Sequence, residues 1–148
     1  MTVQRFPPRS PSVAVSLPSE EELRQIIQKG DAALAVQYAR DIGERLATQL
    51  TSSQIRNVFT TARQIEMNWP IRPKSEDEVL RAARQLVLLK PKLAYQASRE
   101  QRGGIGMKVL RDLLTPAIDL VGNNRNHFQN FIDFFESILA YHTAAGGQ

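Results

Sequence analysis

The 148-residue sequence contains no cysteine, which excludes disulfide bonds and thiolate metal sites. Its two histidines, His127 and His142, have no carboxylate at the spacing of a zinc site. No apolar run approaches the roughly 18 residues needed to span a membrane. We therefore expect a soluble, cytoplasmic protein with no metal, no other cofactor and no membrane partner.

Arrangements of residues that carry out catalysis are also missing. Acid–base catalysis needs a titratable group beside a partner, but His142 falls on the packed face of a helical pattern. His127 follows an asparagine-rich helix start, where a capping or surface role is expected. The segment Gly103-Gly104-Ile105-Gly106 lacks the Lys-Ser/Thr of a phosphate-binding loop. The sequence predicts that this protein is not an enzyme.

Basic residues are concentrated in one segment of the chain. Between Val79 and Arg111 there are eight basic residues and one acid, Glu100, a net charge of +7 against +4 for the whole chain. A folded segment with clustered positive charge is typical of proteins that bind a phosphate backbone. The eight are Arg81, Arg84, Lys90, Lys92, Arg99, Arg102, Lys108 and Arg111.

The spacing of these residues places most of them on one helix face. Seven residues separated by three or four positions fall within an arc of roughly 80°. We call this face the basic stripe; it consists of Arg81, Arg84, Leu88, Lys92, Tyr95, Arg99 and Arg102. The opposite face is expected to pack through Leu86, Val87, Leu89, Leu93, Ala94 and Ala97. An ordinary solvated face would mix charges, because like charges one turn apart repel, so the pattern favours phosphate binding.

Residues that typically begin or end helices recur along the chain and predict an all-α fold. Residues 1–18 hold four of the eight prolines and are interpreted as a flexible arm. Residues 19–148 are expected to form a single domain, a bundle of about five to six helices. Helices are expected to start near Ser19, Asp31, Thr51, Ser75, Met107 and Asn126. Ser19 and Ser75 each open a capping box, and Pro91 is expected to interrupt or kink the basic helix.

Three segments together resemble a known family. Thr51–Phe59 resembles a helix opening of the form T-T/S-S-Q/K-I/L-R-N, and Leu89–Arg99 resembles L-K-x-K-x-x-Y-x-A-G-R. Phe134–Tyr141 is similar to a closing Y/F-F-E-A-L/I-V-A-Y helix. Their order and approximate spacing resemble the Csm small subunit of type III-A CRISPR effector complexes, over about residues 50–147.

The resemblance implies a non-catalytic helical subunit that acts in antiviral defence. Several copies of such a subunit line a filament whose spine binds the CRISPR RNA, and their basic faces follow the target RNA. The expected partners are therefore the target RNA and CRISPR RNA ribonucleoprotein, the backbone and large subunits of the complex, and further copies of the chain. Cleavage and cyclic-nucleotide signalling belong to other subunits.

The motifs and the charge pattern give one set of expected RNA-binding residues: Arg56, Arg63, Arg84, Lys90, Lys92, Tyr95, Arg99 and Arg102. We expect Arg56 and Arg63, which share a face of one predicted helix, to reach a groove bordered by Lys92 and Arg99. On an unbroken helix Lys90 would point about 180° from the basic stripe, and a kink at Pro91 would be needed to turn it outward. Ser98 stands where the family pattern has glycine.

Two other functions fit the same pattern. The chain could be a structural adaptor whose basic stripe faces an acidic protein partner. It could also be the equivalent helical small subunit of Cmr (type III-B) complexes, although the motif order favours Csm.

Overall fold

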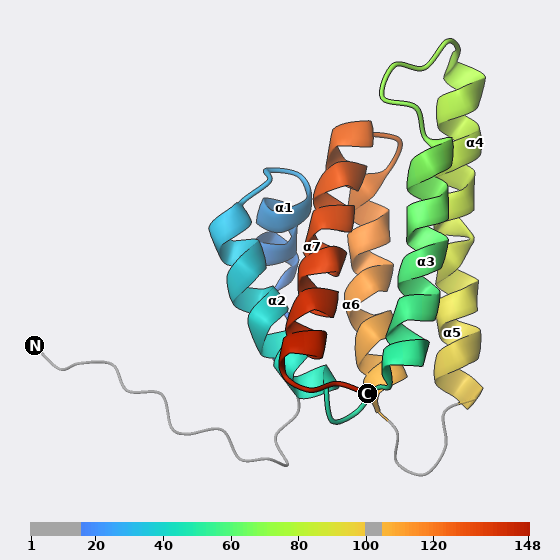
Figure 1. Cartoon of the computed structure of the whole chain (residues 1–148). Helices are drawn as coiled ribbons and strands as arrows, with labels where there is room; N and C mark the ends of the chain where they lie inside the picture. Colours follow the sequence, from blue (N-terminus) through green and yellow to red (C-terminus); the bar gives the residue numbers. More distant parts are fainter. Residues whose placement is uncertain (1–15, 100–104) are drawn as a thin grey trace, which may run out of the picture.

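A computed structural model describes residues 16–99 and 105–148 as seven helices and, within those residues, no strand (Figure 1). They are α1 (Glu20–Ile27), α2 (Ala32–Leu46), α3 (Ser52–Asn68), α4 (Glu76–Val87), α5 (Leu89–Arg99), α6 (Gly106–Val121) and α7 (Arg125–Ala144). Helix α7 lies at the centre, between α2 on one side and α3 on the other, and it also packs against α1 and α6. Helices α4 and α5 pack on α3 and α6, and no other helix among the described residues covers the opposite face of the α4–α5 pair.

The predicted all-α fold is confirmed, and the predicted helix count holds when α4 and α5 are taken as one interrupted helix. Leu88 ends α4 and is followed directly by α5, in which Pro91 is the third residue. Amide groups in the first turn of a helix have no partner within the helix, so the missing N–H of proline costs no hydrogen bond there. The interruption therefore falls one turn before the proline. Of the predicted arm at residues 1–18, residues 1–15 lie outside the described residues.

The helix starts follow the predicted caps, with one difference. Ser19 and Glu22 form a complete capping box, in which the Ser19 Oγ accepts from the Glu22 N–H at 3.1 Å and the Glu22 carboxylate accepts from the Ser19 N–H at 3.0 Å. Ser75 caps α4 through the N–H of Glu78. The second capping box is nevertheless wrong, because the Glu78 carboxylate accepts from the Lys74 N–H at 2.6 Å instead of from Ser75.

Aromatic side chains of α7 form the centre of the core. Phe128, Phe131 and Phe135 are fully buried, and Trp69 at the end of α3 stacks on Phe128 with ring centroids 4.9 Å apart. Phe59 of α3 meets Phe135 edge to face at 5.1 Å. These contacts fix α3 against α7 and so determine where the face of α3 next to α4 and α5 points.

Helices α2 and α7 approach closely at one glycine. A Cβ atom at Gly43 would lie 2.7 Å from the backbone oxygen of Ile138, so no larger residue fits without moving α7. One turn after Ile138 on the same helix, His142 is fully buried, and its Nε2 lies 2.7 Å from the Leu50 carbonyl oxygen, to which it donates. The prediction of a packed histidine is confirmed.

Candidate nucleic-acid interface

The basic stripe lies on the exposed face of α4 and α5. Its described charged members, Arg81, Arg84, Lys92 and Arg99, are all exposed, and no acidic residue occurs between Val79 and Arg99. Within the described part of the chain, neither Arg81 nor Arg84 forms an ion pair. The opposite face packs on α3 and α6 through Ala82, Ala83, Leu86, Leu89, Leu93 and Ala97.

The predicted packing of this helix is wrong at two positions. Val87 is 52% exposed, and Ala94 is also exposed, although both were expected on the packed face. They lie at the edge of the apolar arc, beyond the part that α3 and α6 cover. The exposed apolar Leu88, 52% exposed, lies within the stripe itself.

Tyr95 and Arg99 form a preassembled pair on this face. The Arg99 guanidinium carbon lies 5.5 Å from the centroid of the Tyr95 ring, and one of its nitrogens donates to the tyrosine hydroxyl at 3.4 Å. Tyr95 is 60% exposed, so its ring is available to solvent rather than being packed over the bundle. A cation held over an aromatic ring limits the mobility of both side chains.

Lys92 connects the stripe to α3. Its Nζ donates to the Thr61 hydroxyl at 3.1 Å across a hollow of about 330 Å³ between α3 and α4–α5. The lining residues are Thr61, Gln64, Ile65, Asn68, Gln85, Leu88, Leu89 and Lys92. The polar residues of α3 in this set were not expected from the sequence. The spacing Thr61, Gln64, Asn68 does place them on one helix face and was the signal available.

The two arginines of α3 occupy a different flank of that helix. Arg63 pairs with Glu66 at 2.6 Å and lies 5.9 Å from the Phe59 ring, which packs on α7. Thr61, which faces α5, is two residues before Arg63 and therefore about 200° around the helix. Arg56 is seven residues before Arg63 on α3 and therefore lies on the same flank. The expectation that the two arginines border the same groove as Lys92 is wrong, because this flank faces away from α5.

Lys90 also lies apart from the stripe. Its Nζ pairs with Asp119 of α6 at 2.6 Å, so the interruption before Pro91 does not turn it toward Lys92. Arg111, the last residue of the charged block, pairs with its neighbour Asp112. Arg102 lies outside the described residues. The positive charge of residues 79–111 is thus divided between the exposed face of α4–α5 and the surface of α6.

The described residues contain no group of three or more histidine and acidic side chains able to hold a metal ion. Among the helices of residues 16–99 and 105–148, none combines the length and the apolar character that crossing a membrane requires.

Comparison with known proteins identifies the family. The Csm2 Type III-A family model matches residues 29–148, a longer stretch than the three sequence motifs cover. No curated protein and no solved structure matches this chain. The match decides between the two families that the motifs left open. The chain belongs to the Csm2 type III-A family, the small subunit of type III-A CRISPR effector complexes.

Proposed function

We propose that this protein is a non-catalytic subunit whose basic stripe binds the phosphate backbone of the target RNA as that RNA pairs with the CRISPR RNA. The observation that carries the proposal is the exposed face of α4–α5, which presents four cations and Tyr95 without an intervening acid. Contacts of arginine and lysine with phosphates position a strand without reading its sequence. The binding is therefore expected to be largely independent of sequence.

The residues of this face take different roles. Arg84 and Lys92 contact phosphates through exposed cationic groups. Arg99 contacts a phosphate while it holds the Tyr95 ring, and that ring stacks on a base or packs against a ribose. From Arg81 to Arg99 the face extends about 27 Å, at 1.5 Å per residue, enough for several phosphates of one strand.

Four further members of the expected set contribute in other ways. Arg56 and Arg63 form a second row of positive charge on the far flank of α3, and Arg63 shares its charge with Glu66. Lys90 would have to give up Asp119 before it contacts a phosphate, so we expect the smallest contribution from it. Arg102 remains in the set on the sequence pattern alone.

The partners of the subunit follow from the family and from the proposed binding face. A Csm2 family member is part of a Csm complex with other subunits. We propose that it contacts the backbone and large subunits and further copies of itself, with the target RNA and CRISPR RNA lying along the basic stripe.

A protein-binding role for the same region is the second candidate. Leu80 and Val87 are 45% and 52% exposed on α4 beside the stripe, and exposed apolar side chains are typical of protein contacts. In that case the stripe would face an acidic subunit, and the chain would act as a structural adaptor.

Salt-dependent binding separates the two candidates. With fluorescence anisotropy on a labelled single-stranded RNA, log K should fall with log salt at about −0.7 per phosphate neutralised, a slope of roughly −2 to −4. Lys92→Ala/Arg99→Ala removes about two phosphate contacts and should make the slope shallower by roughly 1.4.

The matched control is Lys29→Ala/Arg40→Ala, which removes the same charge from exposed positions on the other side of the bundle. It should leave the slope nearly unchanged. A flat salt response of the parent protein would contradict RNA binding by the stripe. Full RNA affinity in Lys92→Ala/Arg99→Ala, combined with lost binding to a partner subunit, would establish the adaptor role instead.

A further inference from the structure

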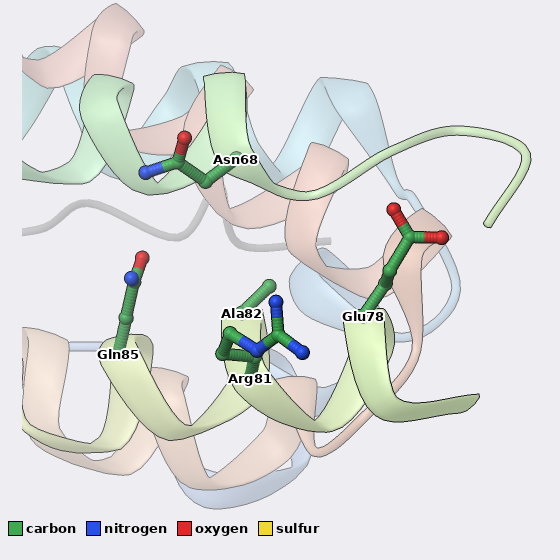
Figure 2. A pocket seen from close by; sticks show the side chains of 5 residues that line it. All are labelled: Asn68, Glu78, Arg81, Ala82 and Gln85. Carbon is green, nitrogen blue, oxygen red and sulfur yellow. The ribbon is translucent and has the colours of Figure 1, made fainter. Parts of the chain in front are cut away.

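Two neighbouring hollows lie between α3 and the α4–α5 pair, and together we call them the trough. The hollow beside Lys92 meets a second hollow of about 300 Å³, and the two share Asn68 and Gln85. Figure 2 shows the second hollow, with Gln85, Arg81 and Glu78 on the α4 side and Asn68 on the α3 side. Each hollow reaches the lower end of the range of about 300–1,000 Å³ that is typical of ligand pockets.

The walls of the trough carry three primary amides that the fold does not use. The side-chain amides of Gln64, Asn68 and Gln85 make no hydrogen bond with any protein group in residues 16–99 and 105–148. Each amide offers two N–H donors and a carbonyl acceptor. Side chains of this type pair with the hydrogen-bonding edge of a nucleobase, where donors and acceptors stand next to each other.

The floor of the trough is apolar. Ile65, Ala82 and Leu89 are 4%, 2% and 2% exposed and line it from below, and Leu88 stands half exposed at the rim. An apolar surface beneath polar walls suits the flat face of a base, whose edge is polar.

The charged residues at the two ends of the trough favour a base, rather than a phosphate, inside it. Arg81 lines one hollow and Lys92 the other, so each end of the trough has a cation that can hold a phosphate of the strand. Glu78 lines the same hollow as Arg81 and would repel a phosphate that entered it, whereas a carboxylate accepts hydrogen bonds from the amino group of a base.

We propose that this trough is a pocket for an unpaired nucleobase of the RNA strand whose backbone lies on the basic stripe. The inference rests on the proposed function, because the strand must first be held by the stripe. Lys92 and Arg81 contact phosphates of the strand at the two ends of the trough, and the amides of Asn68 and Gln85 bind the edge of the inserted base. The stripe then supplies affinity, and the trough fixes how the strand is placed along α4–α5.

The test compares two RNA ligands and two double variants of the full chain. The ligands are a labelled single-stranded RNA and an oligomer of the same length with abasic ribose-phosphate units. Asn68→Ala/Gln85→Ala should bind the base-containing RNA roughly tenfold more weakly than the parent, within the range for an amide–base contact. Its salt slope should be unchanged, because no phosphate contact is lost. Its affinity for the abasic oligomer should equal that of the parent.

A single amide variant on another helix serves as the control, and three results would overturn the proposal. Gln37→Ala removes an exposed amide from α2 and should change neither affinity, and circular dichroism should show every variant folded, since Asn68 and Gln85 are exposed. Equal binding of base-containing RNA by Asn68→Ala/Gln85→Ala and the parent would overturn the proposal. So would an equal loss on the abasic oligomer, or lost binding to a protein subunit with RNA affinity intact. Failure of the proposed function is distinguishable, because the parent itself would then bind neither oligomer.

Discussion

Replacing Phe131 by alanine tests whether the packed centre of the bundle is separate from the RNA-binding face. Phe131 is fully buried on α7, between Phe128 at 6.0 Å and Phe135 at 6.3 Å between ring centroids. Removing a buried phenylalanine ring costs about 3–5 kcal/mol, because the lost contacts and the cavity both destabilise the fold. For a chain of this size about 2–4 °C is lost per kcal/mol, so the melting temperature should fall by about 6–20 °C.

The assay is thermal unfolding followed by circular dichroism, together with RNA affinity measured well below the melting temperature. Phe59→Ala is the matched aromatic control. Its ring is only partly buried, so it should lose less stability than Phe131→Ala. Both variants should keep RNA affinity while they remain folded, and Lys92→Ala/Arg99→Ala should show the reverse behaviour. A melting temperature of Phe131→Ala within about 2 °C of the parent would refute this description of the core.

Three further predictions concern single positions. Gly43→Ala should destabilise the fold by about 1–3 kcal/mol in urea unfolding, because its Cβ would press on the Ile138 carbonyl; a neutral effect would show that α2 and α7 are farther apart. Burial and the 2.7 Å hydrogen bond to Glu22 raise the pKa of Tyr38 to about 12, so the stabilisation from its neutral hydroxyl is complete below about pH 10 and is lost as pH rises through 12. Tyr38→Phe should therefore be less stable than the parent at pH 8, and the difference should shrink between pH 10 and 12; a constant difference would contradict the pKa shift. His142→Ala should lower the melting temperature, since its buried ring donates to a backbone carbonyl, yet leave target-RNA cleavage by the assembled complex chemically unaltered; loss of cleavage in a normally assembled complex would argue for a catalytic role.

Local signals in the sequence predicted most helix starts correctly. Ser19, Asp31 and Thr51 each accept a hydrogen bond from the N–H three residues later, as a cap of their residue type is expected to do. These contacts lie within one turn, so the sequence alone contains both partners. Ser75 follows the same rule, but the Lys74 N–H competes for the Glu78 carboxylate, and only the path of the α3–α4 connection decides between the two.

The site was predicted only where a single helix determines it. The exposure of Lys92, Tyr95 and Arg99 follows from their spacing on α5. The position of Arg63 depends on how α3 is rotated against α7, which the Phe59–Phe135 contact sets. The trough depends on two helices packing side by side. The spacing of Thr61, Gln64 and Asn68 places its α3 wall on one helix face, but no pattern along the chain shows that Gln85 of α4 lies opposite that face.

A cryo-EM reconstruction of the assembled Csm complex with CRISPR RNA and target RNA would show where the RNA lies on this subunit. We expect the target-strand backbone to run along the exposed face of α4–α5, with phosphates in contact with Arg84, Lys92 and Arg99. RNA binding by the basic stripe is contradicted if another protein subunit covers that face while the RNA passes elsewhere.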